Sequence, residues 1–557
     1  MRKLLFISIL TAHYLLGESA KAEEFSFVVI PDTQSYTISA KNMFHMNEQM
    51  KWIKDNKSKE NIVFISHVGD LIENYPNDFD NFIDKVTRKL RINNFCTSNI
   101  FSSSNKIKTR WERASNSLDI LEKPSVKIPY SIIPGNHDYD CATLNYNIKG
   151  VGLKSFKKYF GKDRYVGKNW FLGSDKSNIN MSQKFTANGK KYIHIGLEFL
   201  ASDKAIEYAQ NLIIANPRIP IIISTHYYLN RESCDECWGF GDNNYSTGTN
   251  SPKQLYEKLI EPNPQIFLVF SGHVNGERFN VSKTSMGNTV NQIKASYQSD
   301  PQGGNGWLKI LKFKPSESKL SVKTFSPTFN LKDNKGVDRS KDSKVNLTID
   351  LDINKIHNYL ESHKVLHFRN GQSTLAGSNY DETIDKTISR ENKFLKKIED
   401  LTNGKGNVLI GGKGNKRQGL LKFKNIIGFS TNQVKPNTKI KKAILTLTSE
   451  GIDRKKGVIS VHQMKKAWDH NTSWQDINDG DEIGIVTSIV PPFNIKGTNS
   501  GTRSFDVTDS VQSWLDGSSN QGWLFNAKNN SFANFRSSKW KGISERPMLT
   551  IIYNDNI

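Results

Sequence analysis

Five apolar segments between residues 25 and 275 each stop at a short group of polar residues that bind metal ions well. The endings supply two carboxylates, two amides and two imidazoles. Such a mixture of hard and intermediate ligands suits two divalent ions better than one. Two ions about 3.5–4 Å apart can share a carboxylate and a hydroxide, which attacks a phosphoester while the ions hold the substrate oxygens. The candidate ligands in chain order are Asp32, Gln34, Asp70, Asn136, His226 and His273.

The segments that precede these ligands have the composition of buried strands. An apolar, β-branched run is typical of a central strand in a layered α/β fold, where ligands collect beyond the strand ends. We therefore expect the five ends to meet at one site. The runs and their endings are "FSFVVI" before "PDTQ", "NIVFISHV" before "GDLIEN", "IPYSII" before "PGNHDYD", "RIPIIIST" before "HYY", and "QIFLVF" before "SGHVNG".

A helix is predicted between the first two strands. Apolar residues there recur three and four positions apart, which is the spacing of an amphipathic helix packed on a sheet. Helices that cover parallel strands indicate an α/β fold for this part of the chain. The residues with this spacing, which we interpret as core, are Met43, Met46, Met50 and Ile53.

The five endings resemble the signature blocks of the calcineurin-like metallophosphoesterases, which are D-x-H, G-D-x-x, G-N-H-[DE], a lone His and G-H-x-H. Any single block would be weak support, but five in the family's order are specific. The resemblance implies a four-layer α/β/β/α sandwich that hydrolyses phosphomonoesters or phosphodiesters. The matching stretches are "DTQ" at 32–34, "GDLIE" at 69–73, "GNHD" at 135–138, His226, and "GHVN" at 272–275.

The resemblance also implies a role for each matched ligand. Asp70 would bridge both ions, and Asp32 would bind the first ion. Three further residues would complete the second ion's coordination, namely Asn136, His226 and His273. The family's ions are divalent, and Mn, Fe, Zn, Mg and Ca are all candidates here.

Two residues of the third block are the candidate catalytic groups. By resemblance, His137 would face the substrate and act as a general acid or as a hydrogen-bond donor in the transition state. Asp138 would hold the imidazole of His137 in orientation. His67, beside the second block, is either a supporting residue of the site or a structural histidine, and the sequence leaves both open.

The chain departs from the family pattern at two first-ion positions. Gln34 and Asn275 stand where the family usually has histidine. Their neutral oxygens suit hard cations such as Mn²⁺, Mg²⁺ or Ca²⁺ better than Zn²⁺ or Fe³⁺, so Mn²⁺ is favoured. Three explanations are open: two ions with a harder first site, one tightly bound ion, or a binding or adhesion protein that keeps the fold as a scaffold with a degraded first site.

The stretch after the last ligand is similar to a bacterial branch of the family. "NQIKASYQSDPQGGNGWLKILKF", residues 291–313, resembles the segment found in the branch whose first block reads Pro-Asp-Thr-Gln. The resemblance therefore implies that glutamine at this position is a feature of that branch and not a loss specific to this chain. Tyr297 and Gln298 either reach the site or belong to a hairpin with a buried tyrosine.

The second half of the chain has a different pattern. Short apolar runs separated by Gly- and Asn-rich turns predict an all-β sandwich or jelly-roll from 366 to 557. This stretch resembles the DNRLRE-type domains, which are close to one group of carbohydrate-binding modules. The resemblance implies attachment to a glycan or a cell surface. Four tryptophans there stack on sugars or, more commonly in sandwiches, belong to the core: Trp468, Trp474, Trp514 and Trp523.

The N-terminus predicts export to a secreted or periplasmic location. Residues 1–22 begin Met-Arg-Lys, continue with an apolar stretch and end in Ala-Lys-Ala, as a cleavable signal peptide does. A membrane anchor is the alternative, but the apolar run is short for a span. We thus expect a signal peptide at 1–22, a phosphoesterase domain at 23–352, a linker at 353–365 and the β domain at 366–557, with no membrane span after cleavage.

Charge and cysteine content add further limits. The formal net charge of +22 is spread over both halves, and no basic segment carries the interleaved aromatics of nucleic-acid binders, so specific nucleic-acid binding is not predicted. Four cysteines are too few for a disulfide scaffold in a chain of this length. Three pairings are possible, and we favour Cys96 with Cys141 and Cys234 with Cys237.

Overall fold

The structure is a computed structural model that describes twelve segments of the chain. The predicted signal peptide and three of the four cysteines lie outside these segments. Cys141 is described and takes part in a disulfide, but its pairing with Cys96 stays a prediction. The described residues are 23–74, 104–141, 149–230, 248–329, 337–338, 347–390, 406–411, 416–452, 458–478, 486–489, 501–528 and 532–555.

The first sheet contains three of the predicted strands. Strands β1, β2 and β3 run parallel, and β11 pairs antiparallel with β1, so the sheet is mixed. Its order is β13-β12-β11-β1-β2-β3, with β14 also paired to β12. The strands are β1 (Phe25–Ile30), β2 (Ile62–His67), β3 (Tyr130–Ile132), β11 (Leu308–Lys314), β12 (Lys319–Ser326), β13 (Val337–Asp338) and β14 (Leu347–Asp350).

The second sheet contains the other two predicted strands. Strands β6, β7, β8 and β10 run parallel, and antiparallel strands complete both edges. Its order is β4-β5-β6-β7-β8-β10-β9. The strands are β4 (Phe171–Ser174), β5 (Met181–Ala187), β6 (Lys190–Leu197), β7 (Ile221–Thr225), β8 (Ile266–Ser271), β9 (Gly276–Lys283) and β10 (Thr289–Ser296).

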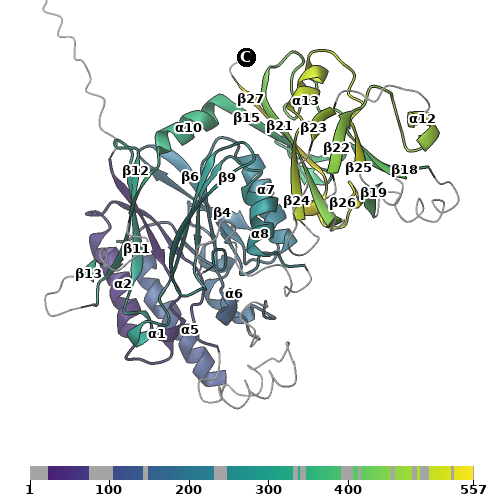
Figure 1. The fold of residues 1–557 in the computed structure, drawn as a ribbon. Helices are drawn as coiled ribbons and strands as arrows, with labels where there is room; N and C mark the ends of the chain where they lie inside the picture. Colours follow the sequence, from purple (N-terminus) through teal and green to yellow (C-terminus); the bar gives the residue numbers. More distant parts are fainter. Residues whose placement is uncertain are drawn as a thin grey trace, which may run out of the picture.

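The side chains of β1 show how the layers are built. Phe25, Phe27 and Val29 join the core between the two sheets, whereas Val28 and Ile30 pack against helices on the outer face. A strand buried on both faces has no polar alternation, which is why its sequence reads as a continuous apolar run. A second set of helices packs on the outer face of the second sheet, giving the order helices, sheet, sheet, helices (Figure 1).

The predicted helix between β1 and β2 is confirmed as α2 (Met43–Asn56). Met46, Met50 and Ile53 are fully buried against the first sheet, each contributing about 1.5–3 kcal/mol by burial. The other helices on that sheet are α1 (Gln34–Thr37), α5 (Ser104–Leu118) and α6 (Lys154–Phe160). Those on the second sheet are α7 (Asp203–Ala215), α8 (Pro252–Leu255) and the π-helical turn η5 (Tyr256–Ile260).

A helix, α10 (Ile353–Ser362), occupies most of the predicted linker, and β15 starts at His363. Beyond it the strand pairs in the described residues are antiparallel, in the orders β15-β27-β21-β26-β19, with β24 on β21, and β18-β20-β25-β22-β23. The strands are β15 (His363–Phe368), β16 (Gln372–Ser373), β17 (Asn379–Tyr380), β18 (Thr383–Ser389), β19 (Asn407–Gly411), β20 (Arg417–Phe423), β21 (Ile440–Ile452), β22 (Val458–Gln463), β23 (Val486–Ile489), β24 (Gly501–Asp506), β25 (Trp523–Lys528), β26 (Phe532–Arg536) and β27 (Met548–Asn554).

Side chains from both of these antiparallel sheets meet in one core, which also receives Trp514 from α13 (Thr508–Leu515). Trp523, Trp514 and Trp468 are at most 5% exposed, and Trp474 packs against a smaller cluster. The core interpretation is confirmed for Trp468, Trp514 and Trp523, whereas Trp474 is only partly buried. The jelly-roll assignment remains a prediction.

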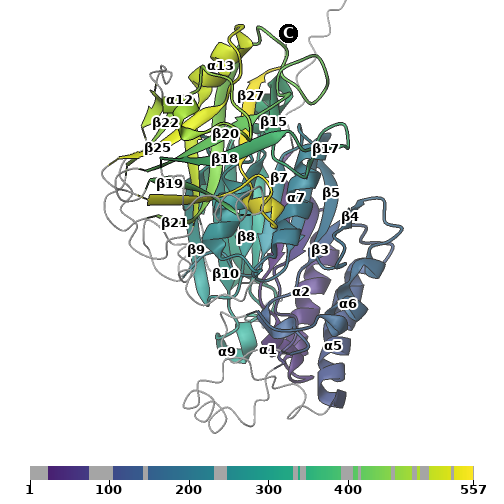
Figure 2. The ribbon, with the colours of Figure 1, turned by 90° about the vertical axis from the view of Figure 1, so that its right-hand side faces the viewer.

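The C-terminal region lies against α7 and α8 of the first region (Figures 1 and 2). Lys258 of η5 is 4% exposed and bridges them, because its Nζ contacts Asp203 Oδ1 at 3.1 Å and Glu545 Oε1 at 2.9 Å. Asn250 Oδ1 accepts a further hydrogen bond from the same ammonium at 2.7 Å. Within the described segments, no helix is long and apolar enough to cross a membrane.

Candidate metal centre

The loops that follow β1, β2, β3, β7 and β8 supply the candidate ligands. Asp70 and His273 have left-handed backbones, with φ of 55° and 67°. Such conformations cost about 1–3 kcal/mol in non-glycine residues and persist where the surroundings enforce them. Thr33 N donates to the Asp70 carbonyl at 2.9 Å, and His273 N donates to Asp32 Oδ1 at 2.9 Å. The loops of the first and second sheets are thereby tied together.

Three glycines allow the backbone to approach these side chains. A Cβ on Gly135 would lie 2.0 Å from Asp70 Oδ1, and one on Gly272 would lie 2.5 Å from Asp32 Oδ2. Gly69 has φ of 99°, and a Cβ there would lie 2.8 Å from His226 Nδ1. Glycine at these positions is therefore a packing requirement of the site.

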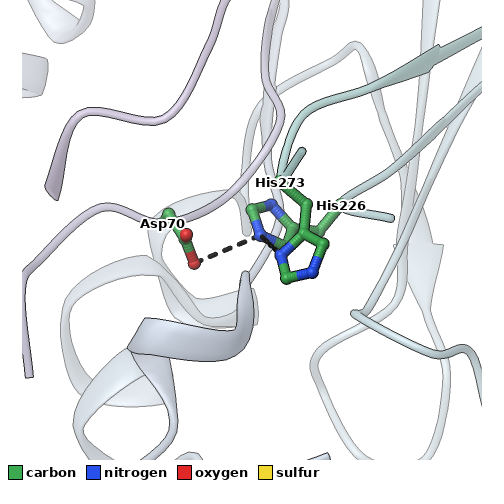
Figure 3. A group of neighbouring side chains, drawn as sticks. All are labelled: Asp70, His226 and His273. Atoms are coloured by element: carbon green, nitrogen blue, oxygen red, sulfur yellow. Dashed lines mark hydrogen bonds and ion pairs between the residues drawn. The ribbon is translucent and has the colours of Figure 1, made fainter. Parts of the chain in front are cut away.

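Four side chains bring their ligand atoms close together, and Figure 3 shows three of them, Asp70, His226 and His273. Asn136 Oδ1 lies 2.8 Å from His273 Nδ1 and 3.0 Å from His226 Nε2. His226 Nε2 lies 3.3 Å from Asp70 Oδ1, and the two imidazole nitrogens lie 3.2 Å apart. Ligand atoms of Asp70, His226 and His273 all fall within 4.8 Å of one another, close enough to share a cation.

Hydrogen bonding sets the direction of the His226 ring. Its Nδ1 donates to the Val68 carbonyl at 2.8 Å, so Nε2 faces the cluster. Burial would lower the pKa of His226, but Asp70 and Asp32 raise it to about 9. Burial would likewise raise the pKa of Asp70, but His226 and His137 lower it. Asp70 and Asp32 therefore attract positive charge to His226, whereas burial and the neighbouring His226 hold the pKa of His273 well below its usual range.

A second group of atoms is buried without hydrogen-bond partners in the described part of the chain. These atoms are oxygens that can bind a hard cation, and leaving each unpaired would cost about 1–3 kcal/mol. Their chemistry fits the first ion that the resemblance implies. They are Asp32 Oδ2, Gln34 Oε1 and Asn275 Oδ1.

The structure also connects these residues to the four-residue cluster. Gln34 Nε2 donates to Asp70 Oδ2 at 3.0 Å, and Asp32 Oδ1 lies 3.9 Å from His226 Nδ1. Burial and the nearby Asp70 raise the pKa of Asp32 to about 6, against the opposing effect of His226. Asn275 lies two residues after His273 in the same loop.

The predicted partner of His137 needs correction. Asp138 accepts from the backbone nitrogens of Leu71 and Ile72 through Oδ1, and from Gly135 through Oδ2. Its carboxylate therefore holds the loops together. Glu73 Oε1 instead lies 2.8 Å from His137 Nδ1, while His137 Nε2 lies 3.9 Å from Asp70 Oδ2.

Sequence reasoning missed Glu73 because, within the matched stretch at 69–73, it gave a role to Asp70 alone. The signal was present, since "GDLIE" places a carboxylate three residues after Asp70. Burial would lower the pKa of His137, but Glu73 and Asp70 raise it to about 9. This ring is therefore held as a proton donor at the edge of the cluster.

His67 is a supporting residue. Its Nδ1 accepts from Gly69 N at 3.2 Å, so Nε2 donates to Thr33 Oγ1 at 2.9 Å. Burial lowers its pKa to about 3, which keeps the ring neutral. It joins the loops after β1 and β2 without facing the cluster.

Lys294 of β10 is a buried cation behind the last loop. Its side chain is completely buried, and its Nζ donates to the carbonyls of Val274 at 2.8 Å and Asn275 at 3.4 Å. Gln298, after the same strand, reaches the site and accepts from Gln34 Nε2. Tyr297 is buried and donates to Glu277 Oε1 at 2.6 Å. Of the two alternatives left open by the sequence, Gln298 therefore fits the one in which it reaches the site, and Tyr297 fits the one in which the tyrosine is buried.

Residues 25–276 match the family model described as calcineurin-like phosphoesterase. This segment is a calcineurin-like phosphoesterase domain. The uncharacterized protein YvnB of Bacillus subtilis strain 168 is 26% identical to the chain over 311 residues, covering 54% of this chain and 20% of YvnB. The match thus spans about a fifth of that relative's length.

Two solved structures show weaker likenesses to the chain that carries this phosphoesterase domain. GAP50, the anchor in the inner membrane complex of Plasmodium, has a TM-score of 0.30 and 13% identity, covering 59% of this chain and 88% of its own. A dimetal phosphatase from Danio rerio has a TM-score of 0.29 and 8% identity, covering 54% and 95%. At these TM-scores neither likeness carries an argument.

Proposed function

We propose that the chain is a metal-dependent hydrolase of phosphomonoesters or phosphodiesters. The observation that carries the proposal is the convergence of a carboxylate, an amide oxygen and two imidazoles at distances of 2.8–3.3 Å on the strand ends of a phosphoesterase domain. Such a group of electron-rich atoms, buried together, is stable only with a cation or bound protons among them.

Two sets of residues would hold two divalent ions. The first set consists of three oxygens that have no hydrogen-bond partner within the described segments, and the second consists of the converged cluster; Asp70 contacts both. Bound ions would supply a nucleophile at neutral pH and charge stabilisation for the phosphoryl oxygens. The first set is Asp32, Gln34 and Asn275, and the second is Asn136, His226 and His273.

His137 would donate a proton to the leaving oxygen. Its ring lies at the edge of the cluster, with Nδ1 on Glu73 and Nε2 directed to the side of Asp70. A donor must carry its proton at working pH, and the raised pKa meets that condition. Glu73 keeps the ring in one orientation and stabilises the charged form.

The test is turnover by the full chain reconstituted with Mn²⁺. We expect hydrolysis of p-nitrophenyl phosphate, of bis-p-nitrophenyl phosphate, or of both, and the ratio of the two rates reports whether monoesters or diesters are preferred. Chelation should remove the activity, and Mn²⁺ should restore it. Failure to hydrolyse either compound with bound Mn²⁺ would favour a binding protein built on the same scaffold.

We also propose that the chain is exported and that its C-terminal region attaches it to a glycan or a cell surface. Support comes from the apolar N-terminal stretch ending in Ala-Lys-Ala and from the motif resemblance of 366–557. Mass measurement of the mature N-terminus tests export, and the expected result is a chain that starts at Glu23. A glycan array with the full chain tests attachment, and no bound glycan would contradict it.

A further inference from the structure

The amide of Gln34 is held in one orientation. Its Nε2 donates both to Asp70 Oδ2 at 3.0 Å and to Gln298 Oε1. The side chain is 2% exposed, and its Oε1 has no hydrogen-bond partner in the described segments. Only the oxygen end of an amide binds a cation, so a flipped amide would place N–H groups where the ion belongs.

A short chain of hydrogen bonds sets this direction. Gln298 Nε2 donates to the carbonyl of His273 at 3.3 Å. Because a backbone carbonyl only accepts, the nitrogen of Gln298 faces His273 and its oxygen is left for Gln34. The nitrogen of Gln34 then faces Gln298, and its oxygen faces away from both neighbours.

We propose that Gln298 is a positioning residue that presents the Gln34 oxygen to the first cation. This inference rests on the proposed function and explains how glutamine can replace the family's histidine there. Asp70 also accepts from Gln34, but Asp70 is itself a proposed ligand of both ions. Gln298 is the anchor that has no ligand role of its own.

The experiment measures Mn²⁺ binding to the full chain by equilibrium dialysis and titration calorimetry. Gln298→Met removes the acceptor at similar volume, and we expect one of two sites to lose about 10–100-fold in affinity, the usual effect of losing a ligand's supporting partner. Gln298→Glu keeps an acceptor for Gln34 but loses the donor to His273, and we expect near wild-type affinity. Gln298→Ala serves as a second acceptor-free variant if methionine disturbs folding.

Gln302 provides the matched control. It lies four residues further on, and its Oε1 contacts His45 Nε2 at 2.7 Å instead of a candidate ligand. Gln302→Met removes an amide of the same kind from the same stretch. We expect it to leave both Mn²⁺ affinities within about twofold of wild type, because its partner lies outside the site.

A double-mutant cycle isolates the orientation effect. The carboxylate introduced by Gln34→Glu has two equivalent oxygens and no N–H, so it has no wrong orientation for Gln298 to prevent. In the Gln34→Glu background, Gln298→Met should therefore change the first-site affinity by less than about twofold. A full 10–100-fold loss in that background would show that Gln298 acts through something other than Gln34 and would overturn the proposal.

The remaining outcomes separate this inference from the proposed function. If wild type binds two Mn²⁺ ions and Gln298→Met binds them equally well, the inference fails and the function stands. If Gln298→Glu is as weak as Gln298→Met, the tether to His273 is responsible and the inference also fails. If wild type binds a single ion, only the inference fails, whereas no Mn²⁺ binding at all overturns both.

Discussion

At the residue scale, the site is defined by which atoms have protein partners and which do not. Asp70 has contacts on both oxygens, whereas Asp32, Gln34 and Asn275 each keep one buried oxygen that is unpaired among the residues the structure describes. Three such oxygens would together cost several kcal/mol in a site without a cation, since each costs about 1–3 kcal/mol. Ion binding should therefore stabilise the folded domain as well as support chemistry.

Asp70→Ala tests the bridging role. This substitution removes the carboxylate that contacts His226 and Gln34, and we expect metal-dependent turnover to fall by more than about 100-fold with loss of bound Mn²⁺. Rates and metal content are measured on the same sample. Asp350→Ala is the control, since its carboxylate is 89% exposed and lies on β14, which pairs with β12 and not with a strand that leads to a candidate ligand. Wild-type turnover in Asp70→Ala would exclude the assignment.

Glu73→Gln tests the positioning of His137. The amide keeps the shape of the side chain but removes the negative charge that raises the pKa of His137. We expect kcat to fall by about 10–100-fold with little change in KM, because the lost interaction matters most when the leaving oxygen takes a proton. A substrate with a good leaving group needs no general acid, so it should show a smaller loss. Equal losses for good and poor leaving groups would contradict the role.

At the element scale, the positions of the loops that carry the candidate ligands depend on how closely the strand ends approach each other. The loops after β2 and β3 touch through Gly69 and Gly135, and Asp138 binds three backbone nitrogens across them. These contacts hold the two loops against each other. The geometry of the site is thus a property of the sheets and their turns.

Gly135→Ala should disrupt that approach. Its Cβ would lie 2.0 Å from Asp70 Oδ1 and 2.4 Å from Asp70 N, so the loop must shift. We expect destabilisation by about 1–3 kcal/mol and weaker Mn²⁺ binding, measured by urea unfolding and dialysis. Gly542→Ala is the control, because its nearest neighbours would be 3.8 Å away. A stable variant with unchanged affinity would mean that the loop tolerates the shift.

At the scale of the whole molecule, Lys258 joins the two regions. The ammonium is buried between Asp203 of the first region and Glu545 of the second, and Ser544 Oγ donates to Asp203 Oδ1 at 3.0 Å. Thr502 N also donates to Glu257 Oε2 at 3.0 Å. The regions are therefore connected by buried polar contacts in addition to α10.

Lys258→Met should weaken that connection. It leaves Asp203 and Glu545 facing each other without a cation, and we expect a loss of about 1–3 kcal/mol, less than for a fully buried pair because Asp203 is 33% exposed. Urea unfolding at pH 7 measures it. Lys319→Met removes an exposed pair and should change stability by less than about 0.5 kcal/mol.

Asp203 should also make stability depend on pH. Burial would raise its pKa, but Lys258 and hydrogen bonds from Asn250, Lys258 and Ser544 lower it below the ordinary value of 3.8. The stabilisation is therefore complete above about pH 4 and is lost as pH falls through the folded-state pKa. Asp203→Asn should flatten the dependence of unfolding free energy on pH below 4. An unchanged slope would contradict the assignment.

The sequence by itself determined the five strands that end at the candidate ligands, the helix α2 and most of those ligands, because buried strands read as apolar runs and ligands stand at their ends. Only the tertiary structure decided that Glu73 and not Asp138 contacts His137, and that Gln298 reaches Gln34 from 264 residues away. Spacing along the chain reports which residues share an element. Which oxygen meets which nitrogen is set by how separate loops pack, and a local pattern carries no record of that.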